Sequence, residues 1–226
     1  MPNEVTVERV VPGGSGLARI DGAVVLVDGG LPGDRLLVEA RSDGPRLLRA
    51  EVVSVLAPGP HRRPPDAVCP LARDGACGGC DWPAARIESH GALKEELVRD
   101  ALRRIGRVPD GELPDVRFVA SPRSYRLRSR LRWDGGGALG FLGRGSSRVS
   151  DLEACEVVST ALLERLPAIR AALGTANVPA CELQTLEGTD GSPLLGELRF
   201  DRALPDPERI AAALHGPLDG LRVLFS

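Results

Sequence analysis

Apolar residues in the first sixty positions recur in short runs that glycine- and proline-rich turns separate. The turn Asp21-Gly22 joins two of these runs and is a strong hairpin signal. The runs lie at Val5–Val11, Leu17–Ile20, Val24–Val27, Leu36–Ala40 and Leu47–Leu56. Five strands of about five residues, at roughly ten-residue spacing, predict a small closed barrel of the OB type. Such barrels frequently bind nucleic acid, but many bind protein or no ligand.

In the rest of the chain, segments with the apolar spacing of a helix alternate with segments that have the spacing of a strand. The segment 57–68 is rich in proline, which excludes a helix or a central strand, so we place a domain boundary there. Apolar spacing predicts helices over 93–105 and 162–173 and a short one that ends at Leu214. Strands are expected over 124–133, 139–142, 182–186, 193–200 and 221–225, with a hairpin turn at Thr189-Asp190-Gly191. The predicted fold is mixed α+β, with a five-stranded OB-like barrel in 1–60 and an α+β central domain in 61–226.

Three cysteines fall within twelve residues, at Cys69, Cys77 and Cys80, and Gly78-Gly79 separates the last two. Glycine permits a tight backbone curl whose N–H groups point at sulfur. A disulfide framework is disfavoured, because the chain has five cysteines, is long and opens with no secretory signal. We therefore expect a metal centre that takes a fourth ligand from Cys155 or Cys181. One close pair, one upstream thiol and one distant thiol suit an iron–sulfur cluster better than structural zinc, although spacing alone leaves zinc open.

The segment 124–133 alternates arginine with mostly apolar residues. In a strand, the arginines at 126, 128, 130 and 132 share one face. Between residues 117 and 148 there are eight arginines and one acid, Asp134. This density favours a phosphate-binding face, and the alternative is a solvated face with carboxylate partners from elsewhere. The candidate RNA contacts are Arg123, Arg126, Arg128, Arg130, Arg132, Arg144 and Arg148.

Composition and charge add limits to this picture. The net charge of the 226 residues is −2, so no global attraction to polyanions is expected. Lysine and arginine total 29, and only Lys94 is a lysine. Arginine is the better phosphate ligand, although a genome that favours arginine also explains the excess. No apolar run approaches the ~20 residues that cross a bilayer, so we expect a cytoplasmic protein with no membrane contact.

Several strings in the chain are similar to those of one family. They are Gly13-Gly14-Ser15-Gly16, Leu31-Pro32-Gly33-Asp34, Cys69 with Cys77-Gly78-Gly79-Cys80, Tyr125-Arg126, Leu139-Gly140-Phe141, Gly145-Ser146-Ser147 and Asp151-Leu152-Glu153-Ala154-Cys155. In this order they resemble the N-terminal and central portion of the RNA (uracil-5-)-methyltransferase family, in the 23S rRNA type that begins with a TRAM domain. The resemblance covers essentially the whole chain and identifies residues 1–60 as the TRAM domain.

The resemblance implies a [4Fe–4S] cluster held by Cys69, Cys77, Cys80 and Cys155, and so selects Cys155 over Cys181. The family has five residues between its first two cysteines, and this chain has seven. The family methylates carbon 5 of uracil with S-adenosylmethionine, through a cysteine nucleophile and a carboxylate base. Those residues belong to a C-terminal methyl-donor-binding domain, whose glycine-rich loop this sequence lacks. The resemblance therefore implies an RNA-binding, cluster-bearing portion that is inactive alone, acts on rRNA and is monomeric.

Two functions of other classes stay open. A stand-alone RNA-binding protein with a structural metal requires the reading frame to end at Ser226. A small iron–sulfur electron carrier requires a reversible redox couple and a docking surface, and the arginine row favours RNA over it.

Overall fold

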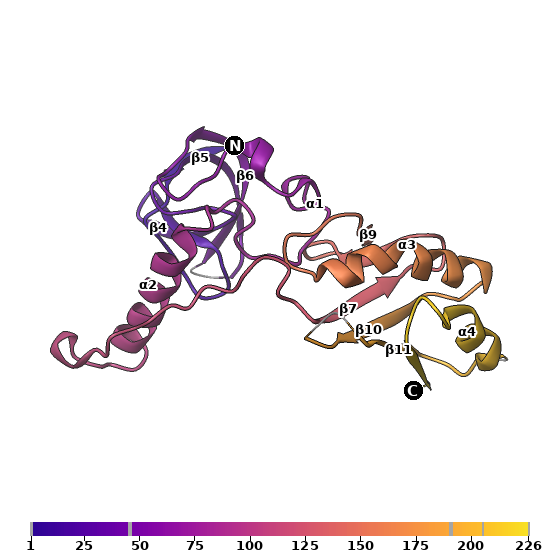
Figure 1. The fold of residues 1–226 in the computed structure, drawn as a ribbon. Helices are drawn as coiled ribbons and strands as arrows, with labels where there is room; N and C mark the ends of the chain where they lie inside the picture. Colours follow the sequence, from indigo (N-terminus) through magenta and orange to yellow (C-terminus); the bar gives the residue numbers. More distant parts are fainter. Residues whose placement is uncertain (1, 45–46, 190–191, 205, 226) are drawn as a thin grey trace. The chain divides into compact units, whose positions relative to one another are not determined.

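The computed structural model describes residues 2–44, 47–189, 192–204 and 206–225, so the expected turn at Thr189-Asp190-Gly191 lies partly outside the described residues (Figure 1). The chain forms two compact units that are interleaved in sequence. The first comprises Met1–Val68 and Cys80–Ala120, and the second comprises Cys69–Gly79 and Ser121–Ser226. The division differs from the predicted boundary near residue 60, because the segment after the cysteine loop belongs to the first unit. Both units are mixed α+β.

The first unit is built on a mixed sheet of six strands in the order β1-β5-β6-β4-β3-β2. These strands are β1 (Asn3–Thr6), β2 (Arg9–Val10), β3 (Gly16–Ile20), β4 (Ala23–Asp28), β5 (Arg35–Ser42) and β6 (Leu48–Ala57). The sequence predicted five strands, and the sixth arises because the first one divides. At the division, the N–H of Val7 donates to Asp34 O at 3.0 Å, whereas the N–H of Glu8 donates to Leu17 O at 2.8 Å. The chain therefore leaves β5 and joins β3 between these two residues.

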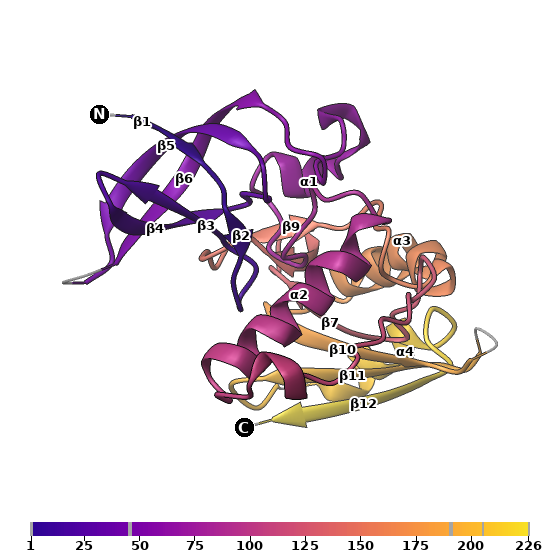
Figure 2. The same cartoon turned by 90° about the vertical axis from the view of Figure 1, so that its left-hand side faces the viewer.

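The interior of this sheet is filled by alternate apolar residues, as the strand period requires. The buried set is Val5, Val7, Ala18, Val25, Val27, Leu36, Val38 and Ala50. The strands curl around this core (Figure 2). Among the described strands of this sheet, β4 and β6 pair in parallel and the other neighbours are antiparallel.

The proline-rich segment is fixed to the first unit and is no free linker. The fully buried carboxylate of Asp34 accepts the N–H of Gly59 at 2.8 Å and forms an ion pair with Arg62 at 2.7 Å. A buried carboxylate without such partners would be strongly destabilising. The helix α2 (Ser89–Arg104) joins the same unit because Leu93 packs in one buried cluster with Val10. Two short 3-10 helices, η1 (Pro65–Ala67) and η2 (Asp110–Glu112), complete it.

The second unit contains another mixed six-stranded sheet, in the order β12-β11-β10-β7-β8-β9. Its strands are β7 (Arg128–Trp133), β8 (Leu139–Leu142), β9 (Val149–Asp151), β10 (Cys181–Glu187), β11 (Leu194–Phe200) and β12 (Gly220–Phe225). Its helices are α1 (Pro70–Arg73), α3 (Thr160–Thr175) and α4 (Pro207–Leu214). The strands and helices predicted from residue 139 onward are confirmed within one or two residues at most ends.

The helices α3 and α4 cover one face of this sheet (Figure 1). Leu131 and Trp133 of β7 point toward them and are at most 2% exposed, and Leu166 of α3 and Leu214 of α4 are buried in the same cluster. Ser159 begins α3, since its Oγ accepts the N–H of Leu162 at 3.2 Å. The opposite face of the sheet therefore carries the polar positions of the same strands.

Candidate cysteine centre and cationic sheet face

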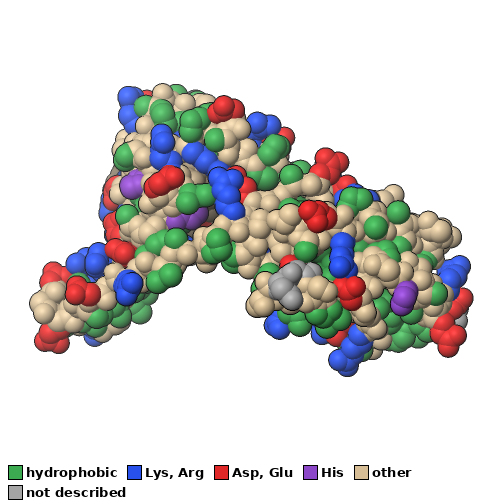
Figure 3. Space-filling view, in the orientation of Figure 1, with side chains coloured by type: hydrophobic (Ala, Val, Ile, Leu, Met, Phe, Trp, Pro, Cys, Tyr) green, Lys and Arg blue, Asp and Glu red, His purple; other side chains and the backbone are tan. Residues whose placement is uncertain are grey.

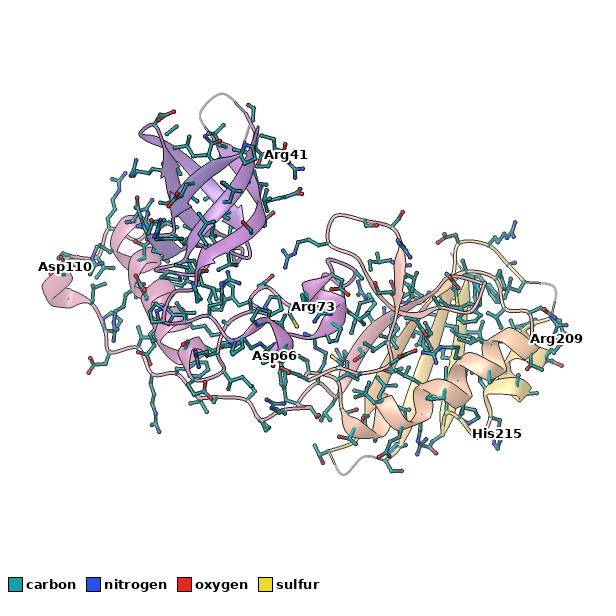
Figure 4. The ribbon with its side chains drawn as sticks, turned by 90° about the horizontal axis from the view of Figure 1, so that it is seen from above. Arg41, Asp66, Arg73, Asp110, Arg209 and His215 are labelled. Carbon is teal, nitrogen blue, oxygen red and sulfur yellow. The ribbon has the colours of Figure 1, made fainter. Side chains whose placement is uncertain are left out.

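The cysteine loop of residues 69–79 is tied to the hairpin of β8 and β9. Cys69 precedes α1, and the N–H of Cys77 returns to Leu71 O at 2.9 Å, which closes the loop. The N–H of Gly78 donates to Leu142 O at 2.9 Å, and the hydroxyl of Ser150 donates to the carbonyl of Ala76. The helix α1 takes up four of the seven residues between Cys69 and Cys77, so the longer spacing closes without an extended loop. Arg73, at the end of α1, marks this loop in Figure 4.

Both glycines of the Cys-Gly-Gly-Cys turn lie where a side chain would crowd its neighbours. A Cβ on Gly78 would lie 3.0 Å from the backbone N and Cα of Arg144. A Cβ on Gly79 would lie 3.4 Å from the Sγ of Cys77 and 3.7 Å from the ring of Phe141. Neither glycine has a positive φ, so the close approach of neighbouring atoms, and not a left-handed backbone, explains these residues.

Three of the four predicted ligands, Cys69, Cys77 and Cys155, belong to the second unit. Burial raises the pKa of the Cys77 thiol, the hydrogen bond from Gly79 lowers it, and the charges of Cys69 and Cys155 raise it again. The N–H of Gly79 approaches the Sγ of Cys77 at 3.4 Å, and the N–H of Val157 approaches the Sγ of Cys155 at the same distance. Half-buried thiols that accept backbone N–H groups suit a thiolate-bound metal or cluster.

The remaining cysteines differ from this set. Cys80 is half-buried and belongs to the first unit. Cys181 lies opposite Trp133 in the sheet and is 7% exposed, and burial raises the pKa of its thiol to about 12. It is therefore a packed thiol and no nucleophile at neutral pH. Over the described residues, no group of three His, Cys, Asp or Glu side chains is arranged to hold a metal ion as it stands.

The predicted arginine row is real in β7 but shorter than expected. Arg128, Arg130 and Arg132 are exposed and alternate with buried Ser129, Leu131 and Trp133. Arg126 lies outside the strand and is only half-exposed. Its N–H donates to Val157 O at 2.9 Å, so the backbone pairs there with the segment after Cys155. Arg126 therefore lies outside the strand that carries the other three arginines.

Sequence reasoning missed two further arginines on this face, which we name the cationic face. The strand register aligns Arg130 with Gln184, Glu197 and Arg222 across four strands. It aligns Arg132 with Glu182 and Arg199 in the neighbouring row. The alternation within 194–200 places Arg199 on the polar face, but only the register brings it beside β7. The cationic face carries Arg128, Arg130, Arg132, Arg199 and Arg222, with Glu182 and Glu197 among them.

The two glutamates act as local partners for these arginines. Glu182 is 8% exposed and lies 2.9 Å from Arg132 and 3.4 Å from Arg130. Glu197 lies 2.6 Å from Arg199 and 3.9 Å from Arg222. The alternative of carboxylate partners therefore holds in part, since four of the five arginines pair with these two carboxylates. Figure 3 correspondingly shows basic and acidic side chains intermingled on the surfaces in view.

The other candidate contacts lie in loops of the second unit. Arg123 is exposed and lies 3.9 Å from Glu156. Arg144 and Arg148 are exposed in the connection between β8 and β9. Beside it, Arg132, Arg148 and Arg199 line an open groove of about 670 Å³ together with Glu182 and Asp201. The groove continues the cationic face toward this loop.

The comparisons with known proteins agree on one family. Residues 3–53 match the TRAM domain. The 23S rRNA (uracil(1939)-C(5))-methyltransferase RlmD of Nitrosospira multiformis is 31% identical over an alignment of 209 positions, which covers 83% of this chain and 46% of the relative. The RlmD protein of Azoarcus sp. is 30% identical over an alignment of 226 positions, which covers 96% of this chain and 51% of the relative.

A solved structure shares the fold. The tRNA (uracil-54, C5)-methyltransferase of Pyrococcus abyssi, in complex with S-adenosyl-L-homocysteine, superposes with a TM-score of 0.60 at 18% identity, over 91% of this chain and 48% of that one. The chain thus spans about half the length of the relatives that it matches. Across the described residues, the helices are all too short or too polar to span a membrane.

Proposed function

We propose that the chain forms the RNA-binding and [4Fe–4S]-bearing portion of an S-adenosylmethionine-dependent enzyme. The reason is that it belongs to the RNA (uracil-5-)-methyltransferase family. The enzyme would methylate carbon 5 of a uridine in 23S rRNA. The observation that carries this proposal is the match to proteins named for that reaction, which extends over 83% and 96% of the chain. This match covers the TRAM region, the cysteine loop and the cationic face together.

The cluster would be held by Cys69, Cys77, Cys80 and Cys155. Support comes from the donor set itself, because Cys69, Cys77 and Cys155 belong to one unit and the thiols of Cys77 and Cys155 accept backbone N–H groups. Thiolate ligands with such N–H donors are the usual surroundings of iron–sulfur clusters. When bound, the cluster supplies a covalent inorganic cross-link between these segments. The chain's own residues shape the site, since Gly78 and Gly79 let the loop approach the β8–β9 hairpin.

RNA would lie along the cationic face of the second unit and on the TRAM barrel of the first. Arg128, Arg130 and Arg132 are exposed along one strand, so several side chains can reach successive phosphates. Glu182 holds the guanidinium groups of Arg130 and Arg132 in place before RNA arrives. Arginine is suited to this role because its planar fork binds phosphate through two hydrogen bonds.

The methyl donor would be bound by the part of the relatives that this chain does not match. The S-adenosyl-L-homocysteine of the Pyrococcus abyssi structure supports the same cofactor for the complete enzyme. We infer that the chain alone binds RNA without methylating it. An enzyme that modifies rRNA would work in the cytoplasm, and we expect a monomer.

A gene deletion tests the proposed function directly. Mass spectrometry of 23S rRNA fragments from the deletion strain should reveal the loss of one 5-methyluridine, and the complete gene should restore it. A copy that encodes only residues 1–226 is the matched control and should not restore the methyl group. An unchanged set of 5-methyluridines in the deletion strain would refute the proposed reaction.

A further inference from the structure

One row of the cationic face contains an arginine and no carboxylate. The strand register aligns Arg128 with Leu186, Leu195 and Gly220 across β7, β10, β11 and β12. In the two rows beside it, the other four arginines of the face pair with its two glutamates. Among the described residues, Arg128 is thus the one arginine of this face without an ion pair. Its charge is therefore available to an anion from outside the chain.

Two leucines form an exposed apolar surface beside this arginine. Leu186 is 44% exposed and Leu195 is 40% exposed, whereas Thr185 and Leu194, their neighbours along the strands, are buried. The two leucines are direct partners in the antiparallel pair of β10 and β11, so their side chains lie close together. Leu195 also extends over Gly220, where an added Cβ would lie 3.0 Å from the Cδ2 of the leucine. The glycine thus leaves room for a flat apolar surface over neighbouring strands.

The chemistry of this row matches that of a nucleotide. Single exposed apolar side chains are common on protein surfaces, but here two adjacent ones lie beside an unpaired cation. A nucleotide offers a flat base, which packs against apolar side chains, and a phosphate, which arginine binds through its planar fork. A protein segment that covers the leucines is the alternative, and it would require no base.

We propose that Leu186 and Leu195 form a base-contact site for one nucleotide of single-stranded RNA, whose phosphate Arg128 binds. This inference rests on the proposed RNA-binding function of the cationic face and deepens it, because it adds a contact to a base. Leucine side chains carry no hydrogen-bonding group, so the site should accept a base without selecting its sequence. The neighbouring rows, whose arginines are held by glutamates, would contact the backbone alone.

The test compares two double variants of the full chain with the wild type. Leu186→Thr with Leu195→Thr removes the apolar surface and keeps residues that suit a strand. The matched control is Ile87→Thr with Ile105→Thr, because these isoleucines of the first unit are 45% and 78% exposed. Fluorescence anisotropy at several salt concentrations measures the affinity for two labelled probes. One probe is a short oligouridine, and the other is an abasic oligomer that has the same sugars and phosphates but lacks bases.

The leucine variant should bind oligouridine about fivefold more weakly than the wild type, in line with the loss of one base contact. It should bind the abasic probe with wild-type affinity and keep the wild-type salt slope, because no charge is removed. Arg128→Gln should instead lower the salt slope by about 0.7 with both probes. The isoleucine control should bind both probes as the wild type does.

Two results with the leucine variant would overturn the inference while RNA binding itself stands. One is wild-type affinity for oligouridine, and the other is an equal loss of affinity for both probes, which would assign the leucines to the fold. An equal loss in the isoleucine control would also contradict a specific base contact. A wild-type chain that binds neither probe would overturn the proposed RNA-binding function and this inference together, so the two failures are distinguishable.

Discussion

Removing two arginines from the cationic face should reduce the salt dependence of RNA binding. We choose Arg128→Gln with Arg130→Gln, because both side chains are exposed on β7. Glu182 lies closer to Arg132, at 2.9 Å, than to Arg130, at 3.4 Å, so Arg130 is the less tightly paired of these two arginines. Glutamine retains the length and polarity of the side chains, so the exposed strand face should fold unchanged.

The magnitude follows from counterion release. Each phosphate contact to single-stranded RNA contributes about 0.7 to the slope of log affinity against log salt concentration. Loss of two contacts should lower the slope by about 1.4. Over a fourfold rise in salt, from about 50 to about 200 mM, the wild-type affinity should therefore fall about sevenfold more than that of the double variant.

Fluorescence anisotropy with a labelled RNA at several salt concentrations measures this slope. The matched control is Arg165→Gln with Arg209→Gln, which removes the same charge from α3 and α4, the helices that cover the other face of the sheet (Figure 1). The control should keep the wild-type slope. Equal reductions in both double variants would refute a specific face, and an unchanged slope in the Arg128 and Arg130 variant would refute the contact itself.

Further predictions concern the loop, the core and the acid stability. Gly78→Ala brings a Cβ within 3.0 Å of the Arg144 backbone and should lower the free energy of unfolding by about 1–3 kcal/mol, as measured by denaturant unfolding. Gly174→Ala, whose Cβ would have no neighbouring atom within 4 Å, should raise the same free energy by about 0.5–1 kcal/mol. Equal effects of the two substitutions would contradict the packing account. Cys181, whose thiol pKa is about 12, should resist alkylation at neutral pH until the protein unfolds, as mass spectrometry of labelled peptides would reveal; rapid labelling of the folded protein would disprove its burial. Asp219 accepts the N–H of Leu194 at 2.7 Å, and this bond, with Arg165, lowers the pKa of its carboxyl group. Its stabilising effect is present above the unfolded pKa and is lost as pH falls through the folded one, so the difference in melting temperature between wild type and Asp219→Asn should shrink below about pH 4 and not grow.

The sequence predicts the features that depend on the local spacing of apolar residues. It does not predict the places where a strand changes its pairing partner. Alternation in 128–133 predicts the buried and exposed sides of β7 correctly, because one side packs under helices and the other meets solvent. The same alternation continues through Arg126, but the backbone there has already left β10 for Val157. The pattern of hydrophobic residues carries no information about this change of pairing partner. The divided first strand at Val7 has the same cause, since tertiary hydrogen bonds decide it.

The candidate site was predictable in its residue types but not in its full extent. The spacing of Cys77 and Cys80 and the glycines between them indicate a metal loop without any structure. The pairing of the segment after Cys155 with Arg126 is a tertiary contact, which spacing does not determine. Arg199 and Arg222 join the cationic face only through the register of β11 and β12, so no local motif would have identified them.

Analysis of iron and acid-labile sulfide in the anaerobically prepared chain tests the central claim most directly. We predict about four iron and four sulfide per chain, a complement that Cys77→Ser and Cys155→Ser abolish and that Cys181→Ser leaves intact. Protein that contains neither iron nor sulfide, or a Cys155→Ser variant that keeps the full complement, would contradict the account.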